Sequence, residues 1–163
     1  MLNKLVLISD PLINDFGPSR PVVLLAREFS KSFDVSIVSS TISMPITRKL
    51  QSYGVTVIDL KVKSFLKDAS LAFFDLYLRE AVRGSISDKL DLPSNAMVLN
   101  FSNTIIHSSL AWYAQGPVST VLRNIREELP LRFRIPLHIF DYVFTNFDIR
   151  MIKKMHGETK AVV

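Results

Sequence analysis

The amino-acid sequence contains no cysteine, which excludes disulfide bonds, catalysis by a thiolate and zinc held by sulfur. This absence fits a reducing compartment, so a cytoplasmic location is expected. No stretch approaches the roughly 18 consecutive apolar residues that a membrane-spanning helix requires. Five glycines and eight prolines, with no low-complexity run, leave little room for a disordered linker. Residues 1–163 are therefore predicted to fold as one domain.

Several catalytic motifs are also missing. The sequence contains no G-x-S-x-G, no G-x-x-x-x-G-K-[ST] and no complete G-x-G-x-x-G. Their absence argues against a hydrolase with a nucleophile elbow, a P-loop NTPase and a dinucleotide oxidoreductase. No metal site and no cofactor are predicted.

Short apolar runs alternate with segments in which apolar residues recur every three to four positions. The run KLVLIS at residues 4–9 is nearly continuous, which is typical of a parallel strand buried on both faces. These patterns predict strands at residues 4–9, 34–39, 55–60, 96–100, 118–122 and 142–145. They predict helices at residues 18–32, 47–53, 64–83 and 105–114.

This alternation of strands and helices, joined by short loops, predicts an α/β fold with an open parallel Rossmann-like sheet. Right-handed crossovers place helices on both faces of such a sheet. Ligands bind at the carboxyl ends of its strands. The segments that directly follow strands are therefore the places to look for functional residues.

Residues 17–40, GPSRPVVLLAREFSKSFDVSIVSS, contain a loop with one glycine, then R-x-V-x-x-L-A-x-x-F, then D-V-x-I-V. This stretch resembles the opening signature of family-4 GT-B glycosyltransferases. Further on, AQGPVSTVL is similar to the family's fifth strand, and FDYVFTNFDIRMIKKMHGETKAVV to its sixth strand, following helix and next strand. The resemblance covers most of the chain and implies a single half of a GT-B architecture, the N-terminal acceptor-side domain of a retaining enzyme.

The chain departs from the family pattern at three places. The donor-site signature, two glutamates separated by seven residues, is absent, so the donor-binding half is expected outside this sequence. Phe16 stands before Gly17 where the family usually has paired glycines. Many relatives place a histidine after the fifth strand, whereas Leu122, Arg123 and Asn124 occupy that region here. No catalytic residue is therefore assigned.

Gly17, Ser19 and Arg20 lie at the start of the first predicted helix. The N–H groups of a helix N-terminus and the helix dipole make a site for an anion such as a phosphate. Ordinary capping and turn formation explain the same residues equally well. We treat the three as candidate substrate-binding residues.

Asn103 and His107 follow the fourth predicted strand, at the edge where an acceptor would lie. Arg123 and Asn124 follow the fifth, where a guanidinium group could hold a phosphate or sugar hydroxyls. These four residues complete the candidate substrate-binding set. The alternatives are a surface or hydrogen-bonded histidine and a solvated helix start paired with nearby glutamates.

The leading hypothesis is the acceptor-binding half of a glycosyltransferase. A nucleotide-sugar donor would be shared with a C-terminal domain, and the acceptor would be a glycan or a lipid-linked molecule. The alternative is a noncatalytic Rossmann-like binding or recruiting subunit at a membrane surface. A formal net charge of +5 is compatible with an anionic membrane and with peripheral attachment at its inner face. Nucleic acid is disfavoured because the basic residues are scattered.

Overall fold

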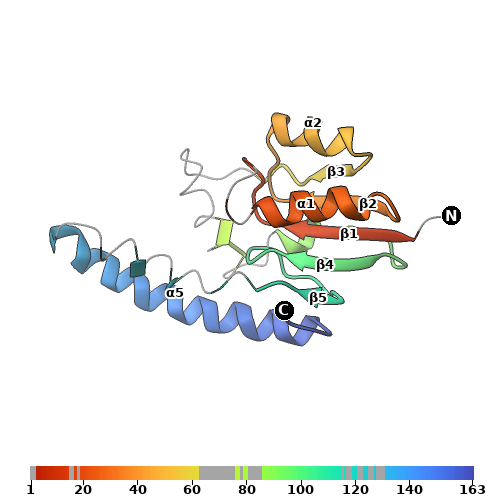
Figure 1. Cartoon of the computed structure of the whole chain (residues 1–163). Coiled ribbons are helices and arrows are strands. Elements are labelled where there is room, and N and C mark those ends of the chain that lie inside the picture. Colours follow the sequence, from red (N-terminus) through yellow and green to blue (C-terminus); the bar gives the residue numbers. More distant parts are fainter. Residues whose placement is uncertain are drawn as a thin grey trace.

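Five parallel strands form one open sheet in the order β3-β2-β1-β4-β5 (Figure 1). The strands are β1 (Lys4–Ser9), β2 (Asp34–Ser39), β3 (Thr56–Asp59), β4 (Met97–Phe101) and β5 (Ala111–Trp112). The structure is a computed structural model that describes residues 3–14, 17, 19–62, 76, 77, 79, 80, 86–114, 116, 119, 120, 123, 124, 127 and 131–163. The expected α/β fold with an open parallel Rossmann-like sheet is confirmed.

The central strand β1 pairs in parallel with β2 on one side and β4 on the other. Leu5 lies opposite Val35 in β2 and opposite Met97 in β4. Successive side chains of a strand point to opposite faces, so Leu5 and Leu7 face one layer of the core while Val6 and Ile8 face the other. Because both faces are covered, the strand is apolar at nearly every position.

Helices α1 (Ser19–Phe29) and α2 (Met44–Ser52) cover the Leu5 face. Their buried residues recur at helical spacing and pack with the inward-facing residues of β1 and β2. The buried positions of the two helices are Val22, Val23, Ala26, Ile46 and Leu50. Each fully buried aliphatic side chain of this kind contributes about 1.5–3 kcal/mol relative to exposure in water.

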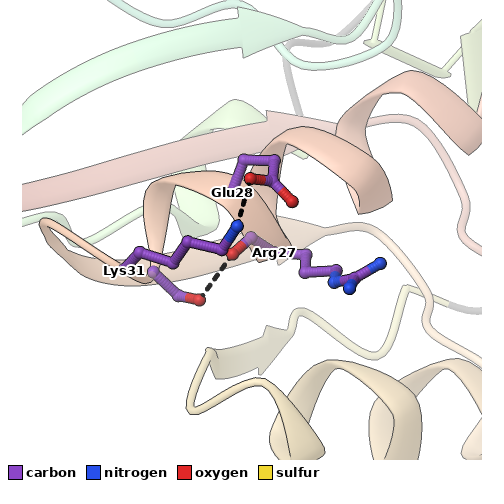
Figure 2. A network of polar contacts seen from close by, with 4 residues as sticks. Arg27, Glu28 and Lys31 are labelled. Atoms are coloured by element: carbon purple, nitrogen blue, oxygen red, sulfur yellow. Dashed lines mark hydrogen bonds and ion pairs between the residues drawn. The ribbon is translucent and has the colours of Figure 1, made fainter.

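Side chains at the end of α1 make polar contacts on the surface, where Lys31 reaches Glu28 beside Arg27 (Figure 2). The guanidinium carbon of Arg27 lies 5.6 Å from the centre of the Tyr53 ring, within reach of a cation–π interaction. Next to it, Lys31 donates to Glu28 at 2.5 Å, and this hydrogen bond and the lysine charge lower the pKa of the Glu28 carboxyl. Both side chains are more than half exposed, so water screens the pair and it adds little stability.

The opposite face carries Val6, Ile8, Val38 and Val98. Leu76, Ile86 and Ile105 pack against this face. The 3-10 helix η1 (Ser87–Lys89) lies just beyond Ile86.

The long helix α5 (Leu131–Glu158) also lies on this side. The Phe144 ring of α5 stacks on Tyr77 at a centroid distance of 5.8 Å, and Met155 contacts Asn100 of β4. Helices therefore cover both faces of the sheet, as expected.

Residues 159–163 run parallel to β5 and extend the sheet beyond it. The N–H groups of Ser109, Trp112 and Ala114 donate to the carbonyl groups of Glu158, Ala161 and Val163 at 2.9–3.0 Å. The N–H groups of Lys160 and Val163 donate back to Ser109 and Trp112. β5 thus has a hydrogen-bonded neighbour on each side although it is only two residues long.

The first half of the chain follows the predicted order closely. Strands 4–9 and 34–39 have the predicted bounds, and β3 and β4 differ from their predicted ranges by one residue at each end. The predicted helix 18–32 is α1, and the predicted helix 47–53 is α2, which begins three residues earlier with Pro45 in its first turn. Proline is tolerated there because the first N–H groups of a helix have no partner within the helix.

Three predicted elements in the second half are wrong. Residues 105–114 contain no helix, and they include β5. The described residues of the predicted strand 118–122, Ser119 and Thr120, are helical. The predicted strand 142–145 lies inside α5.

Of the predicted helix 64–83, Leu76, Tyr77, Arg79 and Glu80 are described and are helical. The rest of that range lies outside the described residues. In the described part of the chain, no helix combines the length and the apolar character needed to cross a membrane.

Candidate ligand site at the carboxyl edge of the sheet

The strand order reverses between β1 and β4, and one side chain connects the carboxyl ends of these two strands. Asp10 follows β1, and its Oδ1 accepts hydrogen bonds from the hydroxyl groups of Ser102 and Thr104 at 2.6 and 2.7 Å. The backbone N–H groups of Asn103 and Thr104 donate to the same carboxylate at 3.0–3.1 Å. Open α/β sheets bind ligands at this point. Here Asp10 connects the end of β1 to the loop after β4.

Burial raises the pKa of the Asp10 carboxyl above its ordinary value. The hydrogen bonds from Ser102, Asn103 and Thr104 act in the opposite direction and stabilise the carboxylate, but burial is the larger effect. Asp10 was not among the candidate residues predicted from the sequence. Its place as an acidic residue directly after the first buried strand is the feature that could have identified it.

Hydroxyl groups connect the other strand ends at this edge. Ser39 donates to the carbonyl oxygen of Asp10 at 2.8 Å, and Thr41 donates to that of Val62 at 3.1 Å. The loops after β1 and β2 also pair through the backbone of Leu12. Within the described residues, the buried Ser40 and Ser43 hydroxyl oxygens have no hydrogen-bond partner.

Gly17, Ser19 and Arg20 lie where the sequence predicted, at the start of α1. Gly17 has a positive φ of 51°, and its carbonyl accepts from the Arg20 N–H at 3.2 Å. Ser19 is partly exposed, and Gly17 and Arg20 are exposed. The anion-binding role of this helix start stays a prediction.

Asn103 and His107 both follow β4, but the structure separates them. Asn103 is partly exposed, and its side-chain Nδ2 donates to the carbonyl of Gly116 at 3.2 Å. His107 places Nδ1 2.7 Å from the carbonyl oxygen of Ser108. It lines a different hollow of about 400 Å³, whose charged residues are Glu80, Asp88, Lys154 and Glu158.

Arg123 and Asn124 do not follow a strand, because the described residues ahead of them are helical. Both are exposed. The Arg123 Nε lies 3.5 Å from Oδ2 of the buried Asp141 in α5, a partner that the sequence did not suggest. The expectation that placed these two residues at the end of a fifth strand is therefore wrong.

A cavity of about 200 Å³ lies between β5 and α5, with Asn103 and Gly116 in its wall. On the α5 side, the Tyr77 hydroxyl donates to Oδ1 of Asp148, and the Ser119 N–H donates to Oδ2 at 2.8 Å. Burial and the hydrogen bond to Asp148 raise the pKa of Tyr77 far above its ordinary value. The sequence did not indicate this pair, because 71 positions separate its members.

Among the described residues, no three histidine, aspartate or glutamate side chains come together as a group that could hold a metal ion. Comparison of the chain with protein-family models, with curated proteins and with solved structures found no match.

Proposed function

We propose that the chain is the acceptor-binding half of a glycosyltransferase, which moves a sugar from a nucleotide-sugar donor to a glycan or lipid-linked acceptor. One observation supports this most strongly. Residues 19–39, which lie within the stretch that resembles family-4 enzymes, form helix α1 and strand β2 next to β1. The resemblance thus falls on a strand–loop–helix–strand unit whose loop is at the ligand-binding edge of the sheet.

The start of α1 supplies the anion-binding element of this proposal. The dipole of α1 favours a phosphate near the start of the helix, and the exposed Arg20 adds a positive charge. Across the edge, the Oδ1 of the partly exposed Asn103 amide can accept a hydrogen bond from a sugar hydroxyl, while its Nδ2 donates to Gly116. Arg123 is held by Asp141 and is not needed for this role.

The test measures the thermal stability of the chain, alone and joined to any region that follows it in its reading frame, with a panel of UDP- and GDP-sugars, followed by an assay for sugar transfer. A ligand that binds only the folded state raises the melting temperature, so one nucleotide sugar should give a shift that the others do not. Arg20→Ala should reduce that shift, whereas Arg27→Ala, at the opposite end of α1, should preserve it. No shift and no transfer with any donor would rule the proposal out.

A noncatalytic recruiting subunit is the second candidate, and the surface of α5 favours it. Leu131, Phe140, Tyr142 and Ile149 are exposed apolar residues of this helix, and Arg134 and Arg150 are exposed basic ones. Apolar and basic side chains on one helix suit an anionic membrane surface. Cosedimentation with anionic vesicles, without a response to nucleotide sugars, would favour this candidate over the enzyme.

A further inference from the structure

The cavity between β5 and α5 has a buried floor and an exposed mouth. Its floor is formed by the buried side chains of Tyr77, Trp112, Met151 and Met155. Its mouth is formed by the exposed residues Ala114, Gly116, Ile152 and Val162. The cavity is therefore reached from solvent near the carboxyl end of β5, and most of its wall is apolar.

Most polar groups in the described part of the wall are engaged with each other or with the backbone. The Trp112 indole donates from Nε1 to the carbonyl of Ser102 at 3.2 Å, and the Tyr77 hydroxyl donates to Asp148. Asn103 donates from Nδ2 to Gly116. A sugar or a phosphate in the cavity would lose hydrogen bonds to water that these engaged groups do not replace. The chemistry of the wall thus selects against polar occupants.

We infer that this cavity binds a single apolar ring, aromatic or cyclohexane-like. Its volume of about 200 Å³ suits one such ring, since a dry protein cavity of roughly 150 Å³ holds benzene. Trp112 and Tyr77 offer aromatic contacts, and the two methionines adapt their shape to a ring placed between them. This inference goes beyond the proposed function and does not depend on it, because the cavity wall is mostly apolar and needs no contact with a sugar or a nucleotide.

Trp112 is the only tryptophan in the chain and lies in the cavity wall, so its fluorescence reports occupancy directly. Toluene and cyclohexanol are the probes, and methanol and glucose are the controls. The ring probes should change the Trp112 emission in a saturable way, with a dissociation constant on the order of 1 mM or tighter. The controls should leave the emission unchanged. No saturable change with either ring probe would overturn the inference.

The position of the bound ring can be checked with methionine methyl groups, since the chain has only five methionines. Bound toluene should shift the methyl NMR signals of Met151 and Met155 through its ring current. Met44, exposed on α2, is the internal reference and should not shift. Equal shifts at Met44 and Met151 would indicate nonspecific binding and would contradict the assigned site.

Two matched variants on α5 test whether the ring binds in this cavity or elsewhere on the helix surface. Ile152 lines the mouth and is 42% exposed, whereas Ile149 lies outside the lining set and is 49% exposed. Ile152→Phe should narrow the mouth and weaken toluene binding about tenfold or more, because a closely packed wall accommodates added bulk poorly. Ile149→Phe should leave the affinity for toluene within about twofold of the wild-type value. Equal affinity in the two variants would place the ring elsewhere.

Discussion

Asp10 shows how one side chain organises the edge of the sheet at which ligands are expected. It accepts hydrogen bonds from two hydroxyl groups and two backbone N–H groups of the loop after β4. Asn103 belongs to that loop and lies in the wall of the cavity. Asp10 is therefore a positioning residue, which acts on any ligand through the loop that it holds.

Replacing Asp10 by alanine should lower the free energy of unfolding by about 3 kcal/mol, because several donors of the Ser102–Thr104 loop would lose their acceptor. Asp34→Ala is the matched control, since Asp34 is exposed at the start of β2. The control should change stability by less than about 0.5 kcal/mol. Urea unfolding followed by circular dichroism measures both variants. Equal stability of the two would show that the Asp10 contacts are energetically unimportant.

The raised pKa of Asp10 also sets the direction of a pH dependence. Between the unfolded pKa, about 3.9, and the higher folded pKa, the folded protein binds more protons than the unfolded chain. The contribution of Asp10 to the free energy of unfolding therefore falls as the pH rises through this interval and is constant above it. Relative to Asp10→Asn, the wild type should be most stable at acid pH. Urea unfolding of both proteins from pH 4 to pH 7 measures this, and a relative stability that increases with pH would contradict it.

The strands that the sequence predicted well are the ones whose own residues determine their state. β1 and β2 are apolar and rich in β-branched residues because they are buried between two layers. β5 consists of only Ala111 and Trp112, and its pairing with β4 and with residues 159–163 makes it extended. Such pairing is set by distant parts of the chain, so the local pattern favoured a helix wrongly.

Residues 142–145 are the converse case, because their local pattern predicts a strand but the structure places them in a helix. Tyr142, Val143, Phe144 and Thr145 are aromatic or β-branched, which favours a strand by propensity. In the structure Phe144, Asp148, Met151 and Met155 form a buried stripe at helical spacing along α5. Two acidic residues on the buried side of the helix, Asp141 and Asp148, obscured that stripe in the sequence.

The candidate site was predictable only in part. Asn103 could be found because it follows a buried strand, and Ser19 and Arg20 because they begin a helix with a clear apolar stripe. The Tyr77–Asp148 hydrogen bond and the cavity beside Trp112 depend on how α5 packs against β5. No local pattern records that packing, so these residues could be identified only from the structure.

Replacing each of two glycines near helix ends by alanine should change the stability of the protein in opposite directions. Gly54 follows α2 with a φ of 76°, and a Cβ there meets no neighbour but forces an unfavourable backbone conformation. Gly54→Ala should therefore cost about 1 kcal/mol. Gly157 lies inside α5 with open space around it, so Gly157→Ala should stabilise the protein by about 0.5–1 kcal/mol. Thermal unfolding of the two variants tests this, and changes of the same sign would refute it.

The full structure combines a covered sheet with a helix that reaches past it. Figure 1 shows the N-terminal part of α5 extending away from the strands. Tyr142 of α5 is 74% exposed. Large exposed apolar surfaces are uncommon on monomeric proteins and usually mark contact sites. The exposed apolar side chains of α5 therefore make this helix the expected contact surface.

We expect the protein to associate with itself as its concentration rises, and Tyr142→Glu to reduce that association because it puts a charge on the exposed surface of α5. Met44→Glu is the control, since Met44 on α2 is similarly exposed at 64%. Sedimentation velocity over a range of concentrations measures the effect. If both variants associate as the wild type does, α5 is not the surface involved.

The pairing of β1 has a consequence for how the protein is made. On one side β1 pairs with β2, which begins at Asp34. On its other side β1 pairs with β4, which begins at Met97 and is therefore synthesised much later. During synthesis on the ribosome, β1, β2 and β3 can assemble while the opposite edge of β1 is still open. An open apolar strand edge pairs readily with other chains. Nascent chains that have not yet reached Phe101 should therefore be the form of this protein most prone to aggregate and most dependent on chaperones.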